Sequence, residues 1–311
     1  MKQITNTILM VRPVRFRMNE QTAVNNFFQE DLDLKNQTLN TMAQQEFDSF
    51  VQALRNKGVQ VIVVEDTFEQ DTPDSIFPNN WNSFHEDGTV ALYPMFAENR
   101  RRERREDILE TLEQEGFEIT SIMDYTAAEA DGLFLEGTGS VVMDRENRIA
   151  YCSLSDRADE GLFIEFCEDF EYTPVIFTSY QSVDGERKPI YHTNVMMCLG
   201  EQLAVICLDA IDDKKERKNV SEHLLRSGKE IVLITEEQLH RFAGNMLQVE
   251  GRGGQRLMVM SSSAFKSLTS GQVKTIEKFG QIVHSSLETI EICGGGSARC
   301  MMAEIFLPRK A

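Results

Sequence analysis

Leu54-Arg-Asn-Lys-Gly58-Val-Gln-Val-Ile-Val-Val64 is the stretch from which the fold can be predicted. In the residues that lead up to its first position, apolar side chains recur at roughly helical spacing, at Met42, Phe47, Phe50, Val51 and Leu54. Gly58 is typical of a helix C-terminus, because glycine readily takes the left-handed conformation found there. The apolar run 59–64 then has the character of a buried strand. The stretch therefore predicts a helix, a glycine stop and a strand, preceded by a first strand at 8–11.

The same order of helix, glycine and strand returns along the chain. Gly116, Gly228 and Gly280 each stand between a helical apolar pattern and an apolar run, and a copy without the glycine fits near Tyr172. The markers lie at positions 58, 116, 172, 228 and 280, so consecutive copies start 52 to 58 residues apart. Further strand signals occur at 89–93, 139–143, 202–206 and 257–260. We therefore expect one α/β domain, residues 1–311, of five similar units around a common axis.

Composition limits the function classes. The 311 residues include 50 acidic and 32 basic side chains, and the net charge of −18 argues against nucleic-acid or anionic-membrane partners. The basic cluster Arg100–Arg105 contains acidic residues and precedes a helical pattern, which favours a solvated helix face. No apolar run approaches a membrane span of about 18 residues, and no signal peptide is seen, so we expect a cytoplasmic protein. The six cysteines lack zinc-like spacing, and we expect neither a metal nor another cofactor.

Chemically competent polar residues fall at one phase of the repeat. Counted from the preceding marker, the distances are 20 or 22 residues for Asn80, Glu136, His192, Asn194 and Cys300, and 17 for Asn245. Equivalent positions of rotated units face the same axis, so we expect these side chains to converge on one pocket. Each residue also has a purely structural interpretation: a turn acid for Glu136, a buried core histidine for His192, and an ordinary turn for Asn79 and Asn80. The four other histidines lie outside this phase.

The C-terminal stretch Gly294-Gly-Gly-Ser-Ala-Arg-Cys300 carries the strongest candidate. Its glycines allow the backbone to turn sharply or approach a ligand closely, and a buried cysteine after a flexible turn is the alternative. Together Cys300, His192 and Glu136 supply a nucleophile, a base and an orienting carboxylate.

These motifs resemble the guanidino-group-modifying enzymes, which include arginine deiminases, dimethylarginine hydrolases and amidinotransferases. The resemblance covers nearly the whole chain and implies a five-bladed α/β propeller (pentein) of pseudo-fivefold ββαβ units. It rests on Phe77-Pro-Asn-Asn80, Glu136-Gly137, His192-Thr-Asn194, Ser155-Asp-Arg157 and the glycine-rich tail. It implies that Cys300 is the nucleophile, His192 the general acid/base, and Glu136 the carboxylate that binds the substrate nitrogens and orients the site.

Two positions depart from the family pattern. The resemblance puts aspartates that grip a guanidinium where this chain has Asn80 and Asn194. A carboxylate only accepts hydrogen bonds, whereas an amide both accepts and donates, which suits a neutral ureido group. Losing two buried negative charges also disfavours a cation. We therefore favour citrulline over arginine, and the chain looks most like the citrulline-hydrolase branch of the family. The second contact to the substrate nitrogens comes from either Asn79 or Asn80.

The expected reaction is attack of a Cys300 thiolate on the ureido carbon, followed by hydrolysis of a covalent intermediate. A free thiol has a pKa of about 8.5, so a base such as His192 is needed. Arg157 is a candidate for the substrate α-carboxylate, with a surface salt bridge as its alternative. Phe77 is a further residue that we expect to contact the substrate. The alternatives are arginine deiminase, dimethylarginine dimethylaminohydrolase, amidinotransferase, and a non-enzymatic propeller that binds ribosomes. The sequence is compatible with a homo-oligomer and with a loop at 66–74 that closes over the pocket, and it decides neither.

Overall fold

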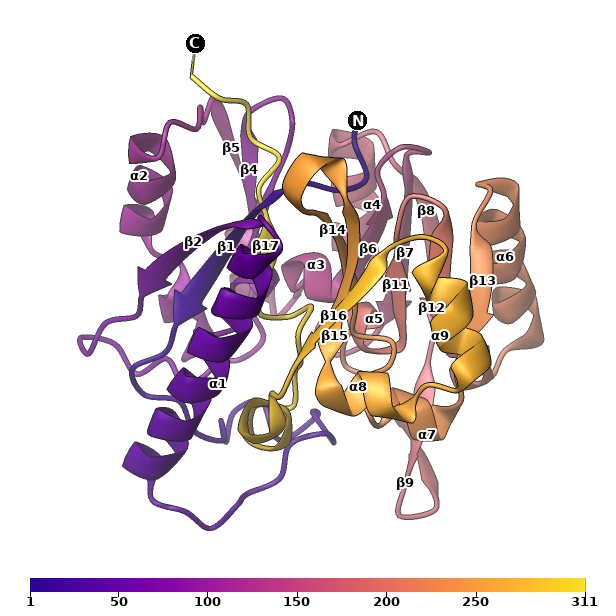
Figure 1. Cartoon of the computed structure of the whole chain (residues 1–311), viewed down its shortest axis with the longest axis horizontal. Coiled ribbons are helices and arrows are strands. Elements are labelled where there is room, and N and C mark those ends of the chain that lie inside the picture. The colour runs from indigo at the N-terminus through magenta and orange to yellow at the C-terminus, as the bar shows by residue number, and fades with distance from the viewer. Residues whose placement is uncertain (311) are drawn as a thin grey trace.

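The first repeat unit forms as the sequence predicts. A computed structural model of the chain describes residues 1–310. In it β1 (Thr7–Arg12) and β2 (Gln60–Glu65) pair in parallel, joined by α1 (Asn36–Asn56), and β17 (Ala303–Glu304) adds to the other side of β1 in antiparallel. The two ends of the chain thus share one sheet (Figure 1), which places the C-terminal tail beside the first strand.

Four further three-stranded sheets repeat this arrangement, each with an antiparallel first pair and a parallel second pair. A helix connects the two parallel strands each time. The sheets and their helices are β3 (Asn82–Phe84), β4 (Thr89–Leu92), α2 (Glu106–Gln114) and β5 (Ser121–Asp124); β6 (Val141–Asp144), β7 (Ile149–Leu154), α4 (Glu160–Asp169) and β8 (Thr173–Thr178); β11 (Met197–Leu199), β12 (Leu203–Ile206), α6 (Lys214–Arg226) and β13 (Glu230–Leu233); β14 (Leu247–Glu250), β15 (Arg256–Ser261), α8 (Ser262–Ser267) with α9 (Ser270–Glu277), and β16 (Gln281–Ser285).

The remaining elements are short. A hairpin of β9 (Tyr180–Val183) and β10 (Glu186–Pro189) stands apart from the five sheets. Brief helices occupy the turns, namely η1 (Pro78–Asn80), η2 (Arg100–Glu103), η3 (Thr126–Asp131), α3 (Gly137–Ser140), α5 (Thr193–Met196), η4 (Leu208–Ala210), α7 (Glu236–Leu239), η5 (Arg252–Gly254) and the π-helical turn η6 (Ile290–Gly294). Three of them, η1, α3 and α5, directly precede the first strand of a sheet or lie one residue from it.

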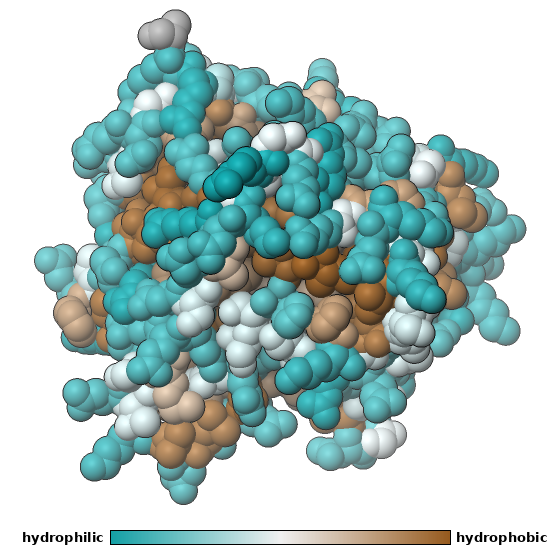
Figure 2. Space-filling model, viewed as in Figure 1, coloured by the Kyte–Doolittle hydropathy of each residue, from teal (hydrophilic) through white to brown (hydrophobic). Residues whose placement is uncertain are grey.

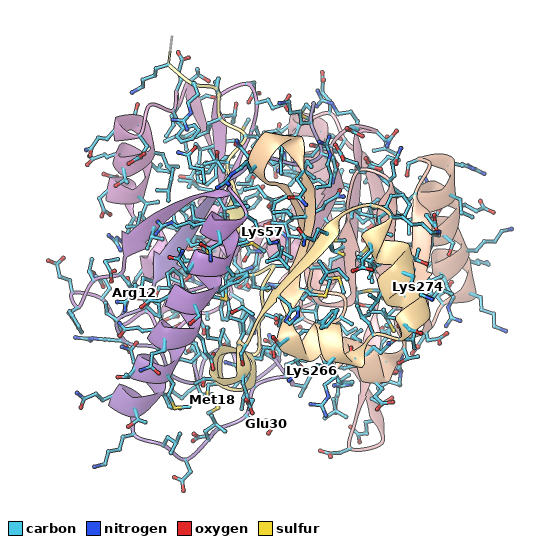
Figure 3. All side chains as sticks on the ribbon, in the orientation of Figure 1. Arg12, Met18, Glu30, Lys57, Lys266 and Lys274 are labelled. Carbon is cyan, nitrogen blue, oxygen red and sulfur yellow. The ribbon has the colours of Figure 1, made fainter. Side chains whose placement is uncertain are left out.

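The long helices lie on the outside of the molecule and bury one face each (Figure 1). In α1 the buried residues are Leu39, Ala43, Phe47, Phe50, Val51 and Leu54, which pack with β1, β2 and the C-terminal tail. Arg12, labelled in Figure 3, ends β1 and pairs with Asp48 on the exposed side of α1 at 2.7 Å. The face seen in Figure 2 is mainly hydrophilic, in keeping with the charged composition. No helix within residues 1–310 has the length and apolarity to cross a membrane.

The predicted mixed α/β class is confirmed, and two predicted strands are shifted. The run 117–120, predicted as a strand, lies before β5, because Glu118 N–H donates to Pro308 O and Phe117 packs under the Arg309 guanidinium instead. Gly139 and Ser140, predicted to begin a strand, form part of α3. In both places contacts with distant segments override the local apolar pattern.

Candidate active site

Each of the five sheets presents a polar side chain shortly before its antiparallel edge strand. Asn80 ends η1 ahead of β3, Glu136 precedes α3 and β6, and His192 precedes α5 and β11. Asn245 and Cys300 stand two and three residues ahead of β14 and β17, which begin at Leu247 and Ala303. All five are nearly or fully buried, with at most 2% of their surface exposed. The common phase read from the sequence therefore corresponds to one structural position in the repeat.

Three residues of the common phase, Asn80, His192 and Cys300, line one small cavity together with two other expected residues, Phe77 and Arg157. Its other walls are Asn26, Asp74, Arg100, Tyr191, Gly294 and Gly296. The open space is ≈ 10 Å³, measured to the centre of a water-sized sphere, which is room for about one water molecule. An amino acid would therefore require the walls to move apart.

Glu136 and His192 form a buried pair that fixes the protonation of the imidazole. His192 Nε2 lies 2.7 Å from Glu136 Oε2, and Phe96 N–H donates to Glu136 Oε1 at 3.0 Å. Burial would raise the pKa of Glu136, but Arg157, His192 and Arg100 outweigh it and lower that pKa to about 2. Burial also lowers the pKa of His192 to about 4, although Glu136 opposes this. At neutral pH the ring is uncharged, donates from Nε2 to the carboxylate, and keeps Nδ1 as a basic nitrogen.

His192 Nδ1 has no hydrogen-bond partner within residues 1–310. Together with the position of the ring in the cavity wall, this leaves one nitrogen free to exchange a proton with Cys300 or with a substrate. Both oxygens of Glu136 are occupied, and Glu136 does not line the cavity. The arrangement favours the expected orienting role of Glu136 over direct binding of substrate nitrogens.

The Cys300 sulfur faces two asparagine amides. Asn194 Nδ2 lies 3.7 Å from Sγ and Asn245 Nδ2 lies 3.3 Å from it. An amide N–H at such a distance can donate a hydrogen bond to the sulfur. The other five cysteines are also buried, and burial raises the pKa of each of their thiols; they are Cys152, Cys167, Cys198, Cys207 and Cys293.

Arg100 overturns the prediction of a solvated basic helix face at this position. Its side chain is only 2% exposed and forms a bidentate pair with Glu103 at 2.9 Å for both bonds. Arg100 Nη1 also donates to Asn80 Oδ1 at 2.8 Å. Because a guanidinium can only donate, this contact identifies the amide oxygen and leaves the Asn80 NH₂ without a partner among the described residues. The burial of Arg100 could not be predicted from the sequence, because interleaved acidic and basic residues occur in both exposed and buried ion pairs.

Asn79 and Asn80 have different surroundings. Asn79 Nδ2 donates to Thr138 Oγ1 at 3.2 Å, and Asn79 is not part of the cavity wall. Asn80 is in that wall, and Phe77 lies against the glycine-rich tail, where a Cβ on Gly294 would come within 2.8 Å of its ring. The geometry therefore favours Asn80 over Asn79 as the residue that contacts a substrate.

Arg157 is 1% exposed, so the alternative of a surface salt bridge is wrong. Its guanidinium donates to Asn25 Oδ1 at 3.0 Å and to Thr22 O at 2.9 Å, and Nη1 lies 3.6 Å from Glu136 Oε2. Asn25 and Thr22 belong to the segment 13–35 that connects β1 with α1. Arg157 therefore binds this segment in the present arrangement.

The segment 13–35 covers the cavity. Asn26 Nδ2 donates to Gly295 O at 3.3 Å, Gln29 Nε2 to Cys293 O at 3.1 Å, and Asn19 Nδ2 to Asp74 Oδ2 at 2.8 Å. The same segment borders an open groove of ≈ 1240 Å³, near whose edge Figure 3 labels Glu30 and Lys266. Asp74, at the end of the loop 66–74, is itself buried in the cavity wall.

Side chains outside this cavity explain His85, one of the four remaining histidines. His85 is buried, stacks on Phe170 with ring centroids 4.0 Å apart and hydrogen bonds with Ser83 at 2.8 Å, which is a structural role. Among residues 1–310 no group of three or more His, Cys, Asp and Glu side chains is arranged to hold a metal ion.

Comparison with known proteins identifies a family for the chain. The family model described as "N,N dimethylarginine dimethylhydrolase, eukaryotic" matches residues 12–307. No curated protein sequence matches the chain.

Solved structures share the fold. ArgZ, an arginine dihydrolase from the ornithine-ammonia cycle in cyanobacteria, superposes with a TM-score of 0.74 at 17% identity over 97% of this chain and 41% of that chain. The N-terminal domain of ArgZ bound to a reaction intermediate gives 0.72 at 18% identity, over 97% and 99% of the two chains. A dimethylarginine dimethylaminohydrolase variant, an adduct with S-methyl-L-thiocitrulline, gives 0.64 at 14% identity, over 97% and 100%. The chain thus spans about two fifths of full-length ArgZ.

Proposed function

The chain belongs to the N,N-dimethylarginine dimethylhydrolase family of hydrolytic enzymes, which act on guanidino C–N bonds, and from this membership and the site geometry we propose that it hydrolyses the ureido group of citrulline. The products are ornithine, ammonia and carbon dioxide. Cys300 is the nucleophile, His192 the acid and base, and Glu136 the group that orients His192. Asn80, Asn194, Phe77 and Arg157 surround the substrate.

The observation that carries the choice of substrate is the hydrogen bond from Arg100 to Asn80 Oδ1. It occupies the amide oxygen and leaves the Asn80 NH₂, a donor, without a partner among the described residues and so available to a substrate. The cavity wall also contains two cationic side chains, Arg100 and Arg157, against one carboxyl group, that of Asp74. A guanidinium consists only of donors and carries a positive charge, so the Asn80 donor and the two arginines oppose it. A ureido group is neutral and offers a carbonyl oxygen to the amide donor.

The reaction begins with the proton of the Cys300 thiol. His192 Nδ1, uncharged because the ring is buried and oriented by the bond from Nε2 to Glu136, takes this proton, and the sulfur forms a bond with the ureido carbon. The C–N bond to the ornithine side chain then breaks, and the imidazolium donates its proton to the leaving amine. Cys300 then carries a carbamoyl group.

Water completes the cycle. His192 accepts a proton from water, whose oxygen attacks the carbamoyl carbon, and the C–S bond breaks to return the thiolate. The carbamic acid released decomposes to ammonia and carbon dioxide. One citrulline and one water thus give one ornithine, one ammonia and one carbon dioxide, with no change of oxidation state.

Access to the site requires the segment 13–35 to move. The cavity holds about one water in the present arrangement, so citrulline enters only when the bonds from Arg157 to Thr22 and Asn25 open. Once released, the Arg157 guanidinium is free to pair with the substrate α-carboxylate in a bidentate manner.

The family description supports dimethylarginine as the alternative substrate, and arginine is the other. Both carry the cationic guanidinium that Arg100 and Arg157 oppose. We also propose that residues 1–311 form one catalytic domain in which the five sheets are blades of a pseudo-fivefold propeller; the common position of Asn80, Glu136, His192, Asn245 and Cys300 supports this arrangement. A cytoplasmic location remains part of the proposal.

The test is turnover of citrulline with detection of the covalent intermediate. We expect the wild-type protein to release ornithine and, after rapid acid quench, to carry a carbamoyl group on the Cys300 peptide by mass spectrometry. Cys300→Ser should lose both signals, whereas Cys207→Ser, at a buried cysteine outside the cavity, should keep them. Ornithine formation by Cys300→Ser at the wild-type rate would contradict the assignment of the nucleophile. A wild-type protein that makes no ornithine would contradict the substrate.

A further inference from the structure

Asn245 is the one member of the five equivalent positions that has no role in the reaction described so far. It precedes β14, the antiparallel edge strand of its sheet, as Asn80, Glu136, His192 and Cys300 precede the antiparallel edge strands of the other four sheets. Its side chain is completely buried. It is also the nearer of the two amides that face the Cys300 sulfur, at 3.3 Å.

Three contacts fix which end of the Asn245 amide faces the sulfur. Arg299 N–H donates to Asn245 Oδ1 at 3.0 Å, which identifies the oxygen, because a backbone N–H cannot accept. The NH₂ donates to Asn194 O at 2.9 Å and also to Asn194 Oδ1 at 3.4 Å. With one hydrogen directed at the backbone oxygen, the other is shared between Oδ1 and Sγ, of which Sγ is the nearer at 3.3 Å. The first of these acceptors also couples Asn245 to Asn194, the other amide beside the sulfur.

The backbone before Asn245 is shaped to place this side chain. Phe242 has a φ of 59°, a left-handed conformation that is uncommon for a bulky residue, and Asn245 N–H closes the turn onto Phe242 O at 2.9 Å. A Cβ on Gly244 would lie 2.4 Å from Val195 O and 2.7 Å from Met196 C. Only glycine permits this approach to the segment that carries Asn194. Strain and close packing at one turn thus serve to bring the amide to the sulfur.

We propose that Asn245 is a further catalytic residue, whose amide N–H donates a hydrogen bond to the Cys300 sulfur and favours the thiolate that attacks the substrate. The proposal rests on the proposed function in one respect, namely that Cys300 is the nucleophile. A hydrogen bond to an anion is about twice as strong as one between neutral groups, so the bond strengthens when the thiol proton passes to His192. It also holds Sγ in position for attack on the ureido carbon.

Asn245→Asp tests this contact with the least change of shape. The carboxylate keeps an acceptor for Arg299 N–H and replaces the donor at the sulfur with a second acceptor. The rate of Cys300 alkylation by iodoacetamide at pH 7, followed by peptide mass spectrometry on the full chain, reports thiolate reactivity without any substrate. We expect this rate to fall at least about tenfold, which is the loss of one hydrogen bond to a charged group. With citrulline, kcat should fall while KM stays near the wild-type value.

Gln248→Glu is the matched control. Gln248 is a buried amide on β14 whose Oε1 accepts from Glu201 N–H and whose Nε2 donates to Phe279 O, away from Cys300. This substitution makes the same change of amide to carboxylate three residues further along the chain, and we expect wild-type alkylation of Cys300. Thermal unfolding of each variant shows whether it is folded. If the aspartate variant does not fold, Asn245→Ser removes the donor without adding a charge and should show the same loss.

A folded Asn245→Asp or Asn245→Ser protein whose Cys300 is alkylated at the wild-type rate would overturn the proposal. The alkylation result is independent of the substrate. If the Asn245 variants are alkylated slowly and the wild-type protein does not turn over citrulline, the role of Asn245 is supported and the proposed substrate is rejected.

Discussion

At the scale of single residues, the pair of Glu136 and His192 determines which proton the site can move. The carboxylate has a pKa lowered to about 2 and the imidazole a pKa lowered to about 4, so at neutral pH the charge lies on Glu136 alone. In the proposed reaction this leaves the free Nδ1 as the base toward the Cys300 thiol. A charged imidazole would have no lone pair for this proton.

These two shifts predict how stability depends on pH. Between about pH 6.5 and 4 an unfolded His192 is protonated while the folded one is not, so stability falls as the pH is lowered through this window. The stabilisation from ionised Glu136 is present above about pH 4.5 and is lost toward pH 2. We expect the melting temperature of His192→Asn to vary less than that of the wild type between pH 6.5 and 4. Parallel curves for the two proteins in calorimetry would contradict the shift of His192.

The types of the residues and their positions in the repeat allowed much of the candidate site to be predicted. Asn80, His192 and Cys300, placed at one phase of the repeat, do line one cavity. Arg100 could not be predicted in this way, because it lies outside the common phase. Its burial depends on hydrogen bonds that its guanidinium donates to Glu103 and to the carbonyl of Phe77. Asn245 fitted the phase loosely, at 17 residues from its marker instead of 20 or 22, yet it occupies the equivalent place ahead of β14.

At the scale of elements, the four-residue helix α3 controls the space beside the reacting groups. Gly139 in this helix leaves room for two side chains of the site: a Cβ there would lie 2.5 Å from Asn80 Nδ2 and 2.7 Å from His192 Nδ1. The sequence indicated a strand at this position, and the Gly-Thr-Gly composition gave no sign of the packing that requires it.

Gly139→Ala should therefore displace Asn80 and His192 without removing either. We expect kcat/KM for citrulline to fall roughly 10²-fold, the usual effect of misplacing a catalytic group by about 1 Å. Gly271→Ala is the matched control, because the nearest atom to its added Cβ is Thr269 Oγ1 at 3.9 Å in the exposed helix α9. Kinetic assays of both variants decide the point, and full activity of Gly139→Ala would show that the helix does not set the site geometry.

At the scale of the whole molecule, five similar sheets each bring one polar side chain to a shared region. The recurring helix, glycine and strand predicted the five helices and most of the strands, because each unit buries its own apolar face. The periodic pattern did not predict the covering segment 13–35, whose bonds to Arg157, Asp74 and Cys293 O join residues far apart in sequence. Such segments lack the apolar period from which regular elements are predicted.

The measurement that tests the central claim most directly is the ratio of kcat/KM for citrulline to that for arginine, determined for the wild-type protein in one assay. A site lined by Arg100, Arg157 and the Asn80 amide should favour the neutral ureido group by roughly 10²-fold or more. A ratio at or below one would contradict the assignment of a ureido substrate, even with Cys300 as the nucleophile.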